Sequence, residues 1–220
     1  MSGGAPPSQG VMAASPRGIG ARNDRCSVEA LTPERFADAA LVLGLLLSTK
    51  GECFGMCRYS WCLPTAEQLG ETYKSDPHSL RTTGVAVVDG KAVGVIRVSV
   101  FGRPKGSRSS DEEALHELRA GEAYVEYLSV TEEARGRGVG TALLRFAEAA
   151  ARAEGATFMS LGVVRGNPAL RLYERVGYRV VPRDCCDSFC TCCFVGCYMG
   201  FPHGRCGADE MEMVLDSSSP

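Results

Sequence analysis

The chain has 220 residues, of which 45% are hydrophobic, and its formal net charge is −2 at pH 7. This length suits one compact domain with tails, and the hydrophobic fraction can fill a core without disulfides or metals. The slight acidity argues against nucleic acid as an electrostatically attracted partner, and no run approaches the roughly 18 apolar residues of a membrane-spanning helix.

Cysteine usage indicates a reducing compartment. The chain has 11 cysteines, and seven of them lie between Cys185 and Cys206. In a short secreted chain so many cysteines would suggest a disulfide scaffold. Here the count is odd and the first residues lack the apolar region of a signal peptide. We therefore expect reduced thiols and a cytoplasmic protein.

Residues 1–24 are rich in Gly, Ser, Pro and Ala, with little that a core would bury. This composition predicts a disordered tail. Acidic residues are absent until Asp24, whereas Arg17 and Arg22 are present. An organellar transit peptide is therefore the alternative interpretation of this segment.

A first strand at about 26–31 precedes two expected helices. Thr-Pro-Glu at 32–34 supplies an N-cap, an N1 proline and an early acid for a helix that runs to about Leu47. The residues at 65–68 have the form of a capping box, which predicts a short helix to about Lys74.

A hairpin and a central strand follow. Strands at 84–88 and 91–101 flank Asp89-Gly90, the strongest two-residue hairpin signal, so we expect them to pair antiparallel. The polar segment 102–120 is a long insertion, in which 111–118 can form a short helix. A strand is then expected at 122–130.

The segment Arg135-Gly136-Arg137-Gly138-Val139-Gly140-Thr141 joins that strand to a helix. The residues after it are apolar at helical spacing as far as about Glu154. The glycines let the backbone turn tightly, and the first amides of a helix lie unpaired at the positive end of its dipole. Such a place binds phosphate, although a plain turn remains possible and the spacing differs from a dinucleotide fingerprint.

The remaining chain alternates strands and one short helix. A parallel strand is expected at 157–164, and Asn167 with Pro168 at N1 starts a helix that Gly177 ends. A strand at 178–181 precedes a cysteine-rich insertion at 183–207. The last strand is expected at 210–215, and 217–220 form a tail.

Two of these segments resemble the motifs of a known family. Arg135-x-x-Gly138-x-Gly140 is similar to motif A, and Asn167 to Tyr178 is similar to motif B, of the GNAT superfamily of acetyltransferases. The resemblance implies one GNAT domain at 25–216. It also implies an α/β fold with about four helices and a mixed sheet of about seven strands. The sheet is mostly antiparallel and is splayed between two parallel central strands.

The resemblance also implies acetyl-CoA as cosubstrate. In the family the pantetheine arm inserts between the splayed strands and pairs with backbone groups, and the pyrophosphate meets the amides of the glycine-rich segment. The cofactor-binding residues implied here are Leu128, Ser129, Val130, Arg135, Gly136, Arg137, Gly138, Val139, Gly140, Thr141 and Asn167.

Acetyl transfer to an amine needs a neutral nucleophile, an oxyanion donor and a proton for the thiolate. Tyr173 matches the family's general acid, with amphipathic packing as the alternative, and the Val130 amide matches the oxyanion donor. Glu126 is the first candidate for the general base and Glu122 the second, while a purely structural or substrate-orienting Glu126 is equally open. Gly162 stands where some relatives carry a catalytic glutamate.

Several functional features stay open. The acceptor is a primary amine on a protein N-terminus, a lysine or a small molecule, and six acidic residues against one arginine from Asp111 to Glu126 favour a cationic one. Trp61, with its neighbours Arg58 and Tyr59, is either a lid over that acceptor or a core plug. The oligomeric state is open.

The cysteine cluster admits three interpretations. Its thiols are inert, lipidated with resulting membrane contact, or metal-binding, although their spacing fits no clean pair of C-x-x-C arms and we assign no metal ligand. Two rival functions are a non-catalytic acyl-CoA-binding module and a zinc- or membrane-linked interaction protein.

Overall fold

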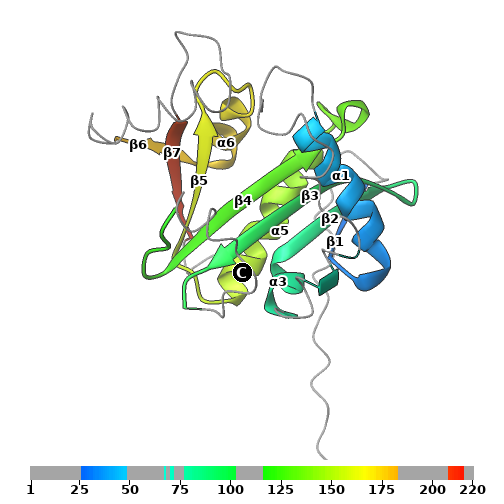
Figure 1. Ribbon diagram of the computed structural model, residues 1–220. Helices are drawn as coiled ribbons and strands as arrows, with labels where there is room; N and C mark the ends of the chain where they lie inside the picture. The colour runs from blue at the N-terminus through cyan, green and yellow to red at the C-terminus, as the bar shows by residue number, and fades with distance from the viewer. Residues whose placement is uncertain are drawn as a thin grey trace, which may run out of the picture.

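The computed structural model describes residues 26–48, 67, 70–71, 77–102, 116–182 and 208–215. They form a mixed α/β fold around a seven-stranded sheet (Figure 1). The strands are β1 (Cys26–Ala30), β2 (Thr83–Val88), β3 (Lys91–Val100), β4 (Glu122–Val130), β5 (Phe158–Val164), β6 (Arg179–Val181) and β7 (Ala208–Val214). The helices are η1 (Pro33–Arg35), α1 (Phe36–Ser48), α3 (Pro77–Thr82), η3 (Glu132–Ala134), α5 (Val139–Ala153) and α6 (Leu170–Val176).

The strand order is β1-β2-β3-β4-β5-β7-β6. Neighbouring strands are antiparallel except β4 and β5, which run parallel. Parallel neighbours need a crossover connection, and α5 is the helix in that connection. The expected mixed sheet, mostly antiparallel with two parallel central strands, is confirmed.

Helices cover both faces of the sheet. Figure 1 shows α1 in front of the sheet and α5 behind it. On the α1 face, Val42 packs with Val95 in one buried cluster. On the α5 face, Leu143 and Ala147 pack with Met159 in a larger cluster, and all three are 0% exposed. Burial of each large apolar side chain contributes about 1.5–3 kcal/mol, so these two clusters fix both helices on the sheet.

Some elements differ from those expected. Helix α3 is not predicted from the sequence, because six residues are too few for a readable periodicity. β7 begins two residues earlier than expected, at Ala208. Residues 116–119, the end of the helix expected at 111–118, are not helical, and the rest of that segment lies outside the described residues.

The start of α6 also differs. The helix begins at Leu170 rather than Pro168, because Asn167 first closes a turn of its own. Its side-chain oxygen accepts the Ala169 N–H at 2.9 Å, and its carbonyl accepts the Leu170 N–H at 3.1 Å. Asn167 thus satisfies amides before the helix starts, as an Asx turn does.

Several predictions concern residues outside the described ones. These are both tails (1–24 and 217–220), the loop with Trp61, most of the helix expected at 65–74 and the cysteine-rich insertion at 183–207. Among the described residues, no helix is long and apolar enough to span a membrane.

Candidate active site

The two parallel strands separate along their length. β4 and β5 pair only from Glu122 with Phe158 to Val125 with Leu161. Beyond these pairs the strands diverge toward their carboxyl ends (Figure 1). Because the two strands separate, backbone groups of β4 have no partner on β5. A ligand in this opening can form hydrogen bonds with those groups.

The opening exposes the backbone of Val130. The Thr131 N–H donates to the Val93 carbonyl at 2.8 Å, so it faces β3. Because successive residues of a strand present their amides to opposite edges, the Val130 and Leu128 amides face the β5 side. These are the two residues for which the sequence predicts backbone contacts with the cosubstrate.

A bulge in β4 increases the separation. The pairing with β3 passes from Arg97–Tyr127 to Val98–Val125, which leaves Glu126 as the extra residue. A bulge bends its strand and increases the local twist. Glu126 therefore lies next to the point where β4 turns away from β5.

The helix start beside this opening has the geometry of an anion site. Gly138 is the N-cap of α5, in the left-handed region at φ 83°, and Gly136 precedes it at φ 72°. The first bond of the helix joins the Ala142 N–H to the Gly138 carbonyl at 3.0 Å. The amides of residues 139–141 come before that bond and point out of the helix at the positive end of its dipole.

The other residues of the segment have distinct roles. The Arg135 side chain donates from Nε to the Val130 carbonyl at 3.3 Å, so it folds over the end of β4. Arg137 is exposed. An ideal Cβ at Gly140 would lie 2.9 Å from Leu172 Cδ2, so glycine at this position lets α6 pack closely against α5. Gly140, which the sequence predicts to bind the cosubstrate, therefore also has a role in helix packing.

Ser129 does not direct its side chain into the opening. Its hydroxyl donates to the Val42 carbonyl at 3.2 Å and joins β4 to α1. A contribution of Ser129 to cosubstrate binding is therefore limited to its backbone.

Tyr173 is a buried phenol on α6. Its residue is 9% exposed, and its ring meets the Tyr178 ring edge-on at 6.1 Å between centroids. Burial, with a smaller contribution from the Tyr124 phenol, raises the pKa of Tyr173 to about 12. The hydroxyl is therefore protonated at neutral pH, as a proton donor must be.

Glu126 forms a buried ion pair with Arg97. Its carboxylate lies 2.9 Å from Arg97 Nε, with side-chain exposures of 6% and 8%, and it accepts a hydrogen bond from the Ser99 hydroxyl. A general base needs a carboxylate that is free to take a proton, whereas the Glu126 carboxylate is paired with the Arg97 guanidinium. This environment favours the structural or substrate-orienting alternative for Glu126 over direct base catalysis.

Glu122 is a buried carboxylate whose oxygens accept several hydrogen bonds. It is 0% exposed and accepts hydrogen bonds from His116 Nε2 at 2.9 Å, the Arg119 amide at 2.6 Å and the Ser160 hydroxyl. Burial alone would raise the pKa of this carboxyl, but the hydrogen bonds from His116, Arg119 and Ser160 outweigh it and hold the pKa far below its ordinary value. Glu122 is thus a poor proton acceptor, which argues against it as the second candidate for the base.

Sequence reasoning missed His116 and Tyr124. The two rings stack with centroids 4.1 Å apart and planes 12° apart. The Tyr124 hydroxyl lies 3.3 Å from the position of an ideal Cβ at Gly162, so it covers β5 where the pairing ends. His116 follows a polar insertion with no periodicity, and only its spacing of six residues from Glu122 could have suggested a pair.

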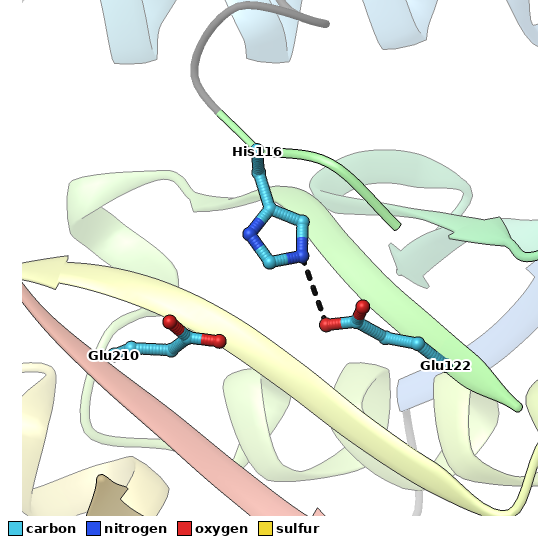
Figure 2. Close-up of side chains that lie close together, drawn as sticks. All are labelled: His116, Glu122 and Glu210. Carbon is cyan, nitrogen blue, oxygen red and sulfur yellow. Dashed lines mark hydrogen bonds and ion pairs between the residues drawn. The ribbon is translucent and has the colours of Figure 1, made fainter. Parts of the chain in front are cut away.

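His116 belongs to a wider polar cluster. His116, Glu122 and Glu210 offer ligand atoms within 4.8 Å of one another (Figure 2). The Arg119 guanidinium lies 3.0 Å from Glu122, 3.1 Å from Glu210 and 2.6 Å from Glu212. A metal ion between the two carboxylates would meet this guanidinium at close range. The donor set is therefore better suited to hydrogen bonding than to metal binding.

Together, the opening between β4 and β5, the unpaired amides at the start of α5 and the protonated Tyr173 form a candidate acyl-transfer site. The chain matches the acetyltransferase (GNAT) family over residues 52–178, more than half of its length. It therefore belongs to this family and is a GNAT-type acetyltransferase. None of the curated protein sequences matches the chain.

Solved structures share the fold. Salmonella typhimurium yncA, solved with acetyl-CoA, is 16% identical with a TM-score of 0.59, covering 90% of this chain and 98% of its own. The ribosomal-protein-alanine N-acetyltransferase of Brucella melitensis is 16% identical with a TM-score of 0.59, covering 86% and 99%. Arabidopsis thaliana Naa50, with the bisubstrate analogue CoA-Ac-MVNAL, is 13% identical with a TM-score of 0.52, covering 86% and 98%.

Proposed function

We propose that the protein transfers the acetyl group of acetyl-CoA to a primary amine by direct attack within a ternary complex. The observation that carries this proposal is the opening between β4 and β5 beside the start of α5. The opening offers unpaired strand amides to a thioester arm, and the helix start offers unpaired amides to a diphosphate. The family match supports the reaction class.

In this proposal the cosubstrate is held mostly by backbone. Leu128 and Val130 pair with the pantetheine arm, and the amides of residues 136–141 bind the pyrophosphate. The Arg135 side chain, which reaches the Val130 carbonyl, and the Asn167 turn border the arm. Fixed amides suit a dianion because they need no reorganisation when it binds.

The chemical step follows from these positions. The neutral amine nitrogen attacks the thioester carbonyl, and the Val130 amide donates to the oxyanion that forms. The C–N bond is made and the C–S bond breaks. Tyr173 gives its proton to the departing thiolate of CoA, and the proton lost from the amine nitrogen restores the phenol. Glu126, paired with Arg97, orients the acceptor rather than accepting its proton.

The proposed acceptor is the amino group of a peptide or protein. Support comes from two structural neighbours whose names state such acceptors, the ribosomal-protein-alanine enzyme and the Naa50 complex with a peptide conjugate. Lysine side chains and small amines are the competing acceptors.

A matched panel of acceptors tests the proposal. Peptides with a free N-terminus and no lysine are compared with N-acetylated peptides that contain one lysine, and with small polyamines. CoA release and acceptor mass are followed together. We expect stoichiometric CoA and acetylated free-N-terminus peptide. Tight acetyl-CoA binding without turnover of any acceptor would favour the non-catalytic binding module instead.

A further inference from the structure

We propose that His116 is the group that accepts the proton of the incoming ammonium, and that Glu122 is the carboxylate that positions it. This inference rests on the proposed function, because it supplies the neutral amine that direct attack requires. It assigns a catalytic role to a residue outside the two motifs of the family resemblance.

The first support is the pairing of the two side chains. His116 Nε2 lies 2.9 Å from Glu122 Oε1, and Figure 2 shows the ring presenting this nitrogen to the carboxylate. Because Glu122 is held as an anion, it can only accept, so Nε2 carries the hydrogen. The neutral ring then has its lone pair on Nδ1. A fixed tautomer of this kind is how a carboxylate prepares a histidine base.

The second support is the rigidity of Glu122. The Arg119 amide at 2.6 Å and the Ser160 hydroxyl hold its carboxylate in addition to His116. The carboxylate is 0% exposed, so it cannot turn toward water. A carboxylate held in place in this way fixes the orientation of the ring that donates to it.

The third support is position relative to the opening. The His116 ring stacks on Tyr124 at 4.1 Å, and the Tyr124 hydroxyl covers Gly162 at the end of the β4–β5 pairing. His116 therefore lies, through Tyr124, beside the point where the pairing of β4 and β5 ends.

The charges around His116 favour an ammonium. The groups that face it are Glu122 and Tyr124 of β4, Arg119 from its own segment and Glu210 of β7. Glu212 of β7 shares the Arg119 guanidinium. Three carboxylates against one guanidinium leave a negative excess, which attracts a cationic acceptor.

The proton balance is complete. The acceptor R–NH3+ gives one proton to His116 Nδ1 and becomes R–NH2, and His116 later returns that proton to solvent. The nitrogen loses its second proton when the tetrahedral intermediate collapses, and this proton replaces the one that Tyr173 gives to the CoA thiolate. The net products are the amide, CoA and one proton.

The test uses His116→Gln, whose amide can still donate to Glu122 but has no basic nitrogen. The matched control is His78→Gln, on α3, where the histidine is partly exposed and lies 3.9 Å from Glu154 at the far end of α5. For both variants and the wild type, kcat/KM is measured from pH 6 to pH 10 with two acceptors. One acceptor is a strongly basic amine, and the other is a weakly basic amine that is already neutral at pH 7. Acetyl-CoA affinity and melting temperature are measured in parallel.

We expect His116→Gln to lower kcat/KM at pH 7 by about 10²- to 10⁴-fold for the basic amine, with acetyl-CoA affinity unchanged. The deficit should shrink as pH approaches the pKa of that amine, and it should be under about tenfold for the weakly basic one. A loss that is equal at every pH and for both acceptors would mean a structural role and would overturn the inference. Activity equal to that of His78→Gln would also overturn it.

Two further results keep the outcomes distinct. If His116→Gln melts early, His116→Phe, which keeps the stacking on Tyr124, undergoes the same comparison. If the wild type acetylates no amine at all, the proposed function fails together with this inference. If the wild type is active and the pH-dependent deficit is absent, only the inference about His116 fails.

Discussion

Replacement of Gly138 by alanine tests the anion site most selectively. Gly138 has φ 83°, where a Cβ is strained, yet an ideal Cβ there would meet no atom within 4 Å. The substitution therefore adds backbone strain without a clash. A left-handed conformation costs an alanine about 1–2 kcal/mol, and the free protein can relieve this strain only by reshaping the helix start.

That cost predicts the change in affinity. Acetyl-CoA binding requires the original amide directions, so binding must reintroduce the strain of about 1–2 kcal/mol that the free protein has relieved. The Kd for acetyl-CoA should therefore rise roughly 5- to 30-fold. Isothermal titration calorimetry measures Kd, and thermal melting measures stability.

Gly155→Ala is the control, because Gly155 follows the other end of α5 at φ 85° and likewise has no atom within 4 Å. Gly138→Ala should bind acetyl-CoA more weakly, whereas Gly155→Ala should keep the wild-type affinity. Equal affinities for the two variants would refute the assignment of the pyrophosphate to this helix start.

Three other predictions follow from buried charges and the phenol. Tyr173→Phe keeps the ring, so acetyl-CoA affinity should hold while rapid-quench kinetics show a chemical step slower by about 10²- to 10⁴-fold, and an unchanged rate would exclude the general-acid role. Because burial raises the pKa of Tyr173 to about 12 from an ordinary value of 10, the stability that the protonated phenol provides is complete below pH 10 and is lost as pH rises through 12. Alkaline denaturation should therefore cost the wild type about 3 kcal/mol more than Tyr173→Phe across this range, and parallel curves would contradict the burial argument. Glu126→Gln leaves the buried Arg97 guanidinium without its counter-charge, so urea titration should show a loss of about 3–5 kcal/mol. The double variant Arg97→Gln/Glu126→Gln should recover much of that stability and keep kcat within about tenfold of the wild-type value. A kcat lower by 10²-fold or more in the double variant would restore Glu126 as the base.

Much of the fold is predictable because its signals are local. Asp89-Gly90 marks the hairpin, and Leu143 and Ala147 repeat on the buried face of α5. The strand and helix boundaries around these residues follow the sequence closely. The exceptions are short or capped segments, such as α3 and the turn at Asn167, where side-chain hydrogen bonds rather than periodicity decide where a helix begins.

Only part of the candidate site is determined by residues that are close together in the sequence. The glycine-rich segment and Tyr173 are legible in the sequence because one turn or one helix positions them. The environment of Glu126 is not, since its Arg97 partner comes from β3 and the bulge that places it appears only when β3 and β4 pair. The pair of His116 and Glu122 likewise depends on Ser160 from β5, which lies 38 residues along the chain from Glu122.

A single-turnover experiment tests the central claim most directly. Protein in excess over acetyl-CoA is mixed with a free-N-terminus peptide, quenched at successive times, and the masses of peptide, CoA and intact protein are followed. Direct transfer predicts that acetyl-peptide and free CoA appear at one common rate, with no acetylated protein at any time. Acetylated protein that forms before the acetyl-peptide, or bound acetyl-CoA that is never consumed, would contradict it.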